Sequence, residues 1–82
     1  MSSHFVYILQ SADGRYYTGY TTDLARRMEE HRGGTGAKFT RGFGFGKLLY
    51  HEEHPTRSDA LKRECELKRL SRAEKRALID EA

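Results

Sequence analysis

The sequence predicts an α+β fold whose elements follow one another in the order β-β-α-β-α-α. Two segments rich in β-branched and aromatic residues, 4–10 and 16–21, flank a short turn, and a similar segment spans 47–54. Helical periodicity with capping residues marks 24–32 and the two stretches that begin at Thr56 and Ser71. A chain of 82 residues has room for one domain, 1-82, with a small core. Each polar residue placed in that core therefore calls for a reason.

The charge balance is mildly basic, with 15 Lys and Arg against 12 Asp and Glu and a pI near 9.2. The excess suits a polyanionic partner, although an ordinary soluble surface explains it equally well. The single Cys65 cannot form an internal disulfide, and we expect it to be a small packing residue in a helix. The chain begins without a signal segment and has no run long enough to span a bilayer. These features predict a protein of the reducing cytoplasm without membrane association.

The turn at Ala12-Asp13-Gly14 decides how two tyrosines are placed. A two-residue Asp13-Gly14 turn would send the side chains of Tyr7 and Tyr17 to opposite faces of the hairpin. A three-residue loop with its glycine in the left-handed conformation instead pairs Leu9 with Tyr17 and Tyr7 with Gly19. Both tyrosines then share one face, and the glycine leaves space over the ring of Tyr7. We predict the three-residue loop.

Two polar side chains lie on the expected buried side of the first helix, 24–32. Leu24 and Met28 mark its apolar stripe, and Arg27 and His31, one turn apart, lie beside or within it. Burying a charge is costly unless it is paired, so both are candidates for a functional site. The alternative is a snorkelling Arg27 and a core histidine bonded to a backbone carbonyl, and for His31 taken alone we favour it.

The segment 33–46 is rich in glycine and is predicted to be a loop rather than a helix or central strand. Basic and aromatic residues on such a loop suit nucleic acid, because cations bind phosphates and rings stack on unpaired bases. Equally, some of the phenylalanines can cap a small core. The residues concerned are Lys38, Phe39, Arg41, Phe43, Phe45 and the following Lys47.

The third predicted strand, 47–54, carries the sequence His51-Glu52-Glu53-His54 and is stopped by Pro55. These four residue types are common metal ligands, but neighbouring side chains of a strand point to opposite faces. We therefore interpret them as a solvated edge.

The helix that begins near Thr56 carries a carboxylate inside its apolar stripe. Asp59 is placed for a capping box, and Glu64 lies among the residues expected to be buried. A carboxylate there needs a cation: Lys68 one turn later, Arg27 across the interface, or a bound metal. The expected buried residues are Ala60, Leu61 and Leu67, and the expected solvent-facing ones are Lys62, Arg63 and Glu66.

A last short helix begins at a complete capping box, Ser71-Arg72-Ala73-Glu74. Leu78 and Ile79 are its apolar anchors. We expect this helix to finish the core.

The ordered set Val6-Tyr7, Tyr17-Thr18-Gly19, Arg27, His31 and Glu64 resembles the GIY-YIG nuclease family, in particular its small stand-alone single-domain members. The resemblance implies a small three-stranded antiparallel sheet flanked by helices and a metal-dependent endonuclease that hydrolyses DNA phosphodiester bonds. It implies that Glu64 holds one divalent metal ion, Mg or Mn, and that Arg27 binds the phosphate. Tyr7 would deprotonate or orient the attacking water, with Tyr17 and His31 completing the hydrogen-bond network. Which group takes the proton stays open.

The sequence departs from the family pattern in two respects. Many members carry a late asparagine, whereas this chain has no Asn, so that position is vacant or is filled by another residue, for which Lys68 is the candidate. No appended DNA-recognition domain is present, so we expect recognition of single strands, ends or branches, or targeting by a partner protein, rather than of a defined sequence. RNA is not excluded as a substrate. The candidate nucleic-acid contacts are Lys38, Arg41, Lys47 and Lys68.

Two further hypotheses belong to other functional classes. A non-catalytic nucleic-acid-binding module on the same scaffold is favoured by the basic and aromatic segment and by the missing asparagine. A protein-interaction domain that uses the exposed helical faces is the weaker one, and it predicts no affinity for nucleic acid.

Overall fold

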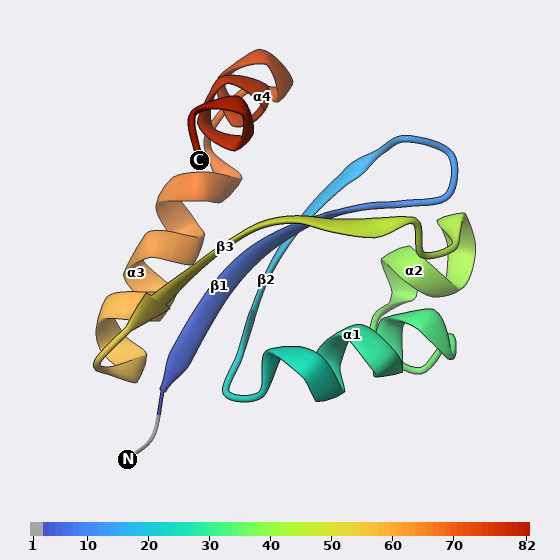
Figure 1. Cartoon of the computed structure of the whole chain (residues 1–82), viewed down its shortest axis with the longest axis horizontal. Coiled ribbons are helices and arrows are strands. Elements are labelled where there is room, and N and C mark those ends of the chain that lie inside the picture. Colours follow the sequence, from blue (N-terminus) through green and yellow to red (C-terminus); the bar gives the residue numbers. More distant parts are fainter. Residues whose placement is uncertain (1–2) are drawn as a thin grey trace.

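The computed structural model describes residues 3–82 and forms a three-stranded antiparallel sheet with helices on both faces (Figure 1). The central strand is β1, and the strand order is β2-β1-β3. The predicted α+β fold and the positions of the three strands are confirmed. The elements are β1 His4–Gln10, β2 Tyr16–Thr21, α1 Leu24–Arg32, α2 Lys38–Phe43, β3 Lys47–His54, α3 Arg57–Lys68 and α4 Arg72–Glu81.

The β1–β2 hairpin has the predicted three-residue loop. The backbone N–H of Ser11 donates to the carbonyl of Arg15 at 2.8 Å and closes the loop, and Gly14 has φ 93°, a conformation that glycine adopts at little cost. Tyr7 lies opposite Gly19, and Leu9 lies opposite Tyr17. Both tyrosines therefore share one face of the sheet, with ring centroids 6.4 Å apart.

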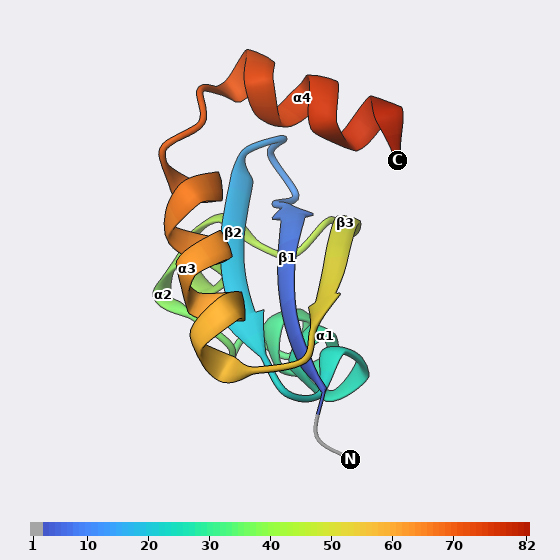
Figure 2. The ribbon, with the colours of Figure 1, turned by 90° about the vertical axis from the view of Figure 1, so that its left-hand side faces the viewer.

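The alternation of β1 divides the core into two layers, one on each face of the sheet. Val6 and Ile8 pack with Ala60 and Leu67 under α3 and α4. Tyr7 and Leu9, pointing the other way, pack with Met28 of α1. Figure 2 shows β1 between its two neighbours, with α3 alongside β2 and α4 across one end of the sheet.

The segment predicted as loop contains the short helix α2, Lys38–Phe43, which corrects that prediction. The glycines of this segment lie mostly outside the helix: Gly36 precedes it, and Gly44, at φ 78°, ends it. Gly42 is inside the helix, and a Cβ added there would have no neighbour within 4 Å. Tertiary packing of Thr40, which is buried, outweighs the low helix propensity of this stretch.

Helix α3 buries a narrower stripe than predicted. Ala60 and Leu67 are fully buried, but Leu61 is 37% exposed and Cys65 is exposed, so the expectation that these two pack in the core was wrong. Successive residues of a helix are turned by about 100°, so Leu61 follows the buried Ala60, and Cys65 follows the partly buried Glu64, on the solvent side. At the start of α3 the Thr56 hydroxyl accepts from the backbone N–H of Asp59, whereas both bonds of a capping box are present at the start of α4.

The predicted solvated edge of β3 is also corrected at Glu52. Its side chain is 17% exposed, and its carboxylate accepts hydrogen bonds from Arg63 of α3, at 3.0 Å from Nε, and from Tyr50. His54 Nε2 lies 3.0 Å from the same carboxylate. Residues two apart on a strand share a face, so Glu52 points toward α3 while its neighbours His51 and Glu53 are exposed. Arg63, expected in solvent, is partly buried by this pairing.

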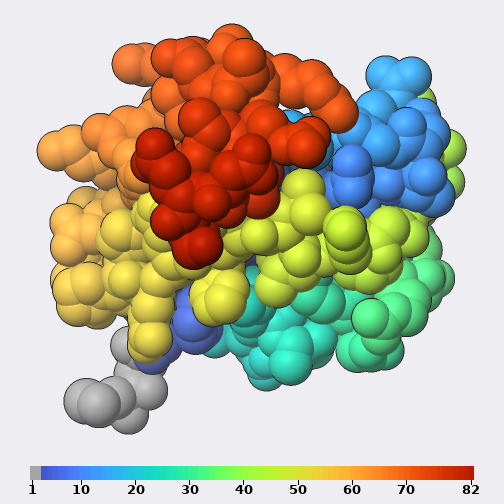
Figure 3. Space-filling view, turned by 45° about the horizontal axis from the view of Figure 1, so that its top comes forward, coloured from blue at the N-terminus to red at the C-terminus, as the bar shows by residue number. Residues whose placement is uncertain are grey.

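Helix α4 covers the end of the sheet next to the hairpin and β3 (Figure 3). Leu78 and Ile79 pack against the layer of Val6 and Ile8, as predicted. Arg72 of α4 donates to the carbonyl of Gly14 at 2.9 Å. Within residues 3–82, none of the helices has the length and apolar character needed to cross a membrane.

Candidate active site

A buried chain of hydrogen bonds runs from β1 through α1 to α2. The hydroxyl of Tyr7 lies 2.8 Å from Nε2 of His31, and Nδ1 of the same ring lies 2.8 Å from Oγ1 of Thr40. The Thr40 hydroxyl donates to the carbonyl of Ala37 at 3.2 Å. Tyr7, His31 and Thr40 are all at most 3% exposed, so these polar groups depend on one another for partners.

Gly19 makes room for Tyr7, as the sequence predicted. A Cβ at this position would lie 2.5 Å from Cζ of Tyr7 and 3.0 Å from Cε2 of Tyr17, distances that real Cβ atoms do not tolerate without a shift. The ring of Tyr17 lies 5.7 Å from that of His31 and stacks on Phe39 at 5.1 Å. The two tyrosines and the histidine thus form one packed cluster.

Burial and nearby charges keep the central pair neutral. Burial raises the pKa of Tyr7 to about 12; interaction with the adjacent Arg27 lowers it, and the charge of Glu64 adds to the increase. Burial lowers the pKa of His31, as does the positive charge of Arg27, while Glu30 opposes the shift. At neutral pH Tyr7 is therefore a phenol and His31 an uncharged imidazole.

Arg27 has an unused donor beside this pair. Its Nη1 donates to Oε1 of Glu30 at 3.0 Å, but its Nε is buried and has no hydrogen-bond partner among residues 3–82. The side chain as a whole is 27% exposed. A buried N–H of a guanidinium without an acceptor is costly, and a phosphate oxygen is the acceptor that its geometry suits best.

Glu64 approaches the site from α3. Its side chain is 18% exposed, and its carboxylate lies 3.3 Å from Nζ of Lys68. Of the three cations considered for Glu64, the structure therefore pairs it with Lys68. The charge of Glu64 is near enough to raise the pKa of Tyr7. The described part of the chain has no group of three or more His, Cys, Asp or Glu that could hold a metal ion without further ligands.

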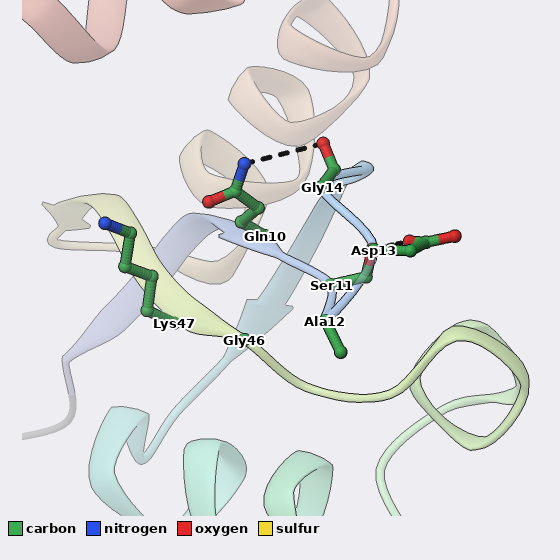
Figure 4. A pocket seen from close by; sticks show the side chains of 7 residues that line it. All are labelled: Gln10, Ser11, Ala12, Asp13, Gly14, Gly46 and Lys47. Carbon is green, nitrogen blue, oxygen red and sulfur yellow. Dashed lines mark hydrogen bonds between the residues drawn. The ribbon is translucent and has the colours of Figure 1, made fainter.

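The four predicted nucleic-acid contacts are exposed but do not form one cluster. Lys38 and Arg41 lie on α2, and Lys68 lies on α3 beside Glu64. Lys47 lies away from these residues and lines an open hollow of about 460 Å³ beside the loop of the β1–β2 hairpin (Figure 4). That hollow contains none of the five candidate catalytic residues; its lining consists of Gln10, Ser11, Ala12, Asp13, Gly14, Gly46 and Lys47.

The phenylalanines of the same segment divide between the two expected roles. Phe39 and Phe45 pack against the layer of Tyr7, Leu9 and Met28. Phe43 is 41% exposed, and the guanidinium of Arg15 lies 4.2 Å from its ring centroid. Only Phe43 is therefore placed to meet a ligand with much of its ring.

Two residues of the site were missed in the sequence: Thr40, which contacts His31, and Gly36, which packs against it. A Cβ at Gly36 would lie 2.6 Å from Nδ1 of His31. No periodic pattern links these positions to His31, because the chain turns back on itself between α1 and α2 (Figure 1). The only available signal was a glycine and a threonine shortly after a histidine.

Comparisons with known proteins identify the family of the chain. The family described as the GIY-YIG catalytic domain matches residues 3–77 of the chain. The chain belongs to the GIY-YIG family. A UPF0213 protein of Halobacterium salinarum is 51% identical over 76 residues, which are 93% of this chain and 99% of that protein. A UPF0213 protein of Staphylococcus aureus (strain N315) is 48% identical over 81 residues, 99% of each chain.

Two solution NMR structures resemble this GIY-YIG chain. The UPF0213 protein BH0048 from Bacillus halodurans is 46% identical, with a TM-score of 0.61 over 95% of this chain and 83% of that one. The protein EF2693 from E. faecalis is 40% identical, with a TM-score of 0.63 over 98% of this chain and 85% of that one.

Proposed function

We propose that this GIY-YIG protein is a metal-dependent endonuclease that hydrolyses phosphodiester bonds in DNA. The observation that carries the proposal is the unpartnered Nε of Arg27 beside the buried pair of Tyr7 and His31. A donor for the phosphate next to a neutral hydroxyl and a neutral imidazole is what hydrolysis of a phosphodiester by water requires.

The residues present fit a divalent cation that the substrate helps to hold. Mg²⁺ commonly uses one or two carboxylates together with substrate phosphates and waters, and it does not need a closed protein cage. Glu64 supplies such a carboxylate and is partly exposed. When bound, the ion would supply Lewis-acid stabilisation of charge on the phosphate and the leaving oxygen.

The remaining side chains act on the phosphate and the water. Arg27 binds the phosphate through Nε and stabilises the negative charge that grows on it during the reaction. Tyr7 stays a phenol because its pKa is about 12, so it orients the water through its hydroxyl rather than acting as a phenolate. Tyr17 packs against Tyr7 and His31 and keeps both rings in place.

We further propose that the enzyme selects the structure of its substrate rather than its sequence, and that single-stranded or branched DNA is preferred. The four exposed cations, Lys38, Arg41, Lys47 and Lys68, are suited to phosphate contacts, which position a nucleic acid without reading its bases. The same proposal leaves two points to experiment: whether RNA is also cleaved, and whether a partner protein directs the enzyme to its substrate.

The deciding experiment incubates the purified protein with single-stranded, duplex and branched DNA and with RNA, in magnesium, manganese or a chelator. We expect metal-dependent cleavage that Glu64→Ala and Arg27→Ala abolish. Lys62→Ala, on the exposed face of α3, and Arg26→Ala, beside Arg27, are the matched controls and should keep it. Cleavage that survives in Glu64→Ala would reveal a contaminating nuclease and remove the support for the proposal.

A non-catalytic nucleic-acid-binding module is the second candidate. It is favoured by the ion pair of Glu64 with Lys68, which already satisfies the only carboxylate proposed for the metal. It predicts binding without cleavage in every metal, with a log-log salt slope of about −0.9 for each phosphate contact on duplex DNA. Binding that ignores salt would exclude it.

A further inference from the structure

The direction of the hydrogen bonds around His31 assigns a role to Thr40. We propose that Thr40 is a positioning residue: it holds the proton of His31 on Nδ1, so that Nε2 is free to accept the proton of Tyr7. The part that concerns catalysis rests on the proposed function, whereas the placement of the proton does not.

The hydroxyl of Tyr7 fixes the proton of His31 from one side. This buried hydroxyl has one hydrogen to donate, and its hydrogen-bond partner among the described residues is Nε2 of His31, at 2.8 Å. The other polar neighbour, Arg27, carries only donors. The hydroxyl hydrogen of Tyr7 must therefore point at Nε2, and Nε2 must be without a proton.

Thr40, at the other end of the row of hydrogen bonds, fixes the same proton independently. Thr40 has a single hydroxyl hydrogen, which it donates to the carbonyl of Ala37. Toward His31 its oxygen can then only accept, so Nδ1 carries the ring proton across the 2.8 Å contact. A neutral imidazole with a proton on Nδ1 has its lone pair on Nε2. The three hydrogen bonds therefore all point the same way: Tyr7 donates to His31, His31 donates to Thr40, and Thr40 donates to the carbonyl of Ala37.

The surroundings prevent another group from replacing Thr40. Gly36 lies so close that a Cβ there would be 2.6 Å from Nδ1 and 2.9 Å from Cα of His31. Phe45 stacks against the imidazole with a centroid distance of 6.5 Å, and the histidine is 1% exposed. The ring can neither turn over nor meet bulk water, so the hydroxyl of Thr40 sets which nitrogen is protonated.

This arrangement gives the proton of the attacking water a destination. As the water oxygen bonds to phosphorus, the bond between phosphorus and the leaving oxygen breaks, and the leaving oxygen keeps the electron pair and takes a proton from solvent. The proton of the attacking water moves to Oη of Tyr7, and the hydroxyl proton of Tyr7 moves to Nε2 of His31. One O–H bond forms at Tyr7 as another breaks, so the tyrosine is neutral before and after, and His31 ends as an imidazolium. Tyr7 can therefore serve although burial raises its pKa, since no free phenolate is needed.

The charged and titratable groups around His31 act on this imidazolium in opposite senses. Tyr7 and Tyr17 face the ring from the sheet, and Arg27 and Glu30 act on it from α1. Arg27 disfavours the positive charge and Glu30 favours it. The Nδ1–H bond to Thr40 persists in the charged form, so the imidazolium keeps its partner.

The test measures the side-chain ¹⁵N signals of His31 by NMR in the wild type, Thr40→Val and Thr40→Ser, with the signals assigned by their loss in His31→Gln. We expect the proton on Nδ1 in the wild type. Thr40→Val keeps the shape of the side chain but removes the acceptor, so the Nε2–H form should become populated and the cleavage rate should fall about 10-fold or more. Thr40→Ser keeps the hydroxyl, so it should show the proton on Nδ1 and the wild-type cleavage rate.

A wild-type His31 with its proton on Nε2 overturns the assignment, and so does a Thr40→Val protein with unchanged tautomer and rate. The NMR measurement on the wild type needs no substrate, and its signals are assigned with the His31→Gln variant alone. A protein that cleaves no nucleic acid would therefore refute the proposed function, while the wild-type spectrum would still decide the role of Thr40 in placing the proton.

Discussion

One face of the sheet is packed by aliphatic side chains, whereas the other buries a row of hydrogen-bonded polar groups. The fully buried centre of the apolar face consists of Val6 and Ile8 with Ala60 and Leu67. The polar face places Tyr7, next to them on the same strand, against His31 and Thr40. Alternation along β1 thus separates two environments by the thickness of a single strand.

The difference shows where this small domain obtains its stability and where it gives some up. Burying an aliphatic side chain stabilises the fold by itself, whereas burying a polar group costs free energy unless its hydrogen-bond partner is in place. The polar face satisfies this condition at Tyr7, His31 and Thr40 but leaves Nε of Arg27 without a partner, and on the other face the hydroxyl of Thr18, opposite Ile8, also has none among the described residues. We therefore expect damage to the apolar face to lower stability alone, and damage to the polar face to lower activity as well.

The strongest effect on stability is expected from Leu67→Ala. Leu67 is fully buried in the apolar face, so truncation should lower the free energy of unfolding by about 2–5 kcal/mol. Urea denaturation followed by circular dichroism measures the change. The cleavage rate per folded molecule should be unchanged, because Leu67 lies on the opposite side of the sheet from Tyr7.

Leu61→Ala on the same helix is the matched control. Leu61 is 37% exposed, so its truncation should change the unfolding free energy by at most about 0.5 kcal/mol. Equal losses from both leucines would mean that the apolar face is not the main source of stability, and a slower folded Leu67→Ala enzyme would mean that the two faces are coupled.

The sequence predicted the strands and the hairpin register well because local chemistry decides them. Gly14 fixes the loop, and once the loop has three residues, alternation places Tyr7 opposite Gly19. The same logic placed Arg27 and His31 on one side of α1. These predictions depend on residues that are near one another in the chain.

The predictions that were wrong concern residues whose structure depends on contacts with distant parts of the sequence. The helix α2 forms in a glycine-rich stretch because Thr40 and Phe39 find partners on α1 and β2. Leu61 and Cys65 are exposed because only a narrow stripe of α3 meets the sheet. Likewise, the pairing of Glu52 with Arg63 joins residues from β3 and α3, and strand alternation alone could not reveal it.

A smaller loss of stability but a larger loss of activity is expected from Gly19→Ala. The added Cβ would overlap the end of the Tyr7 ring, and overpacking of this kind costs about 1–3 kcal/mol. Displacing the hydroxyl of Tyr7 by even about 1 Å should lower the cleavage rate about 100-fold. Gly42→Ala is the control, since its Cβ would meet no atom within 4 Å, and it should leave activity unchanged. Normal cleavage by folded Gly19→Ala would show that the position of Tyr7 does not matter.

The ion pair of Glu52 adds a pH-dependent term on the apolar side of the sheet. Burial opposes ionisation of this carboxyl, but hydrogen bonds from Arg63, Tyr50 and His54 outweigh burial and lower the pKa of Glu52 below its ordinary value of 4.5. The folded protein therefore binds this proton less readily than the unfolded chain does. Its contribution to stability is complete above about pH 4.5 and is lost as the pH falls through the lower pKa of the folded state.

The smallest effect is accordingly expected from Glu52→Gln, which should lower the unfolding free energy at pH 7 by about 1 kcal/mol, the upper end for partly exposed ion pairs. The difference from the wild type should shrink as the pH falls below 4.5, because the wild-type carboxyl then becomes neutral as well. Urea denaturation at a series of pH values measures it, with Glu53→Gln on the exposed side of β3 as control. A gap that stays constant down to pH 3 would mean that the side-chain amide, rather than the missing charge, disturbs the contact with Arg63.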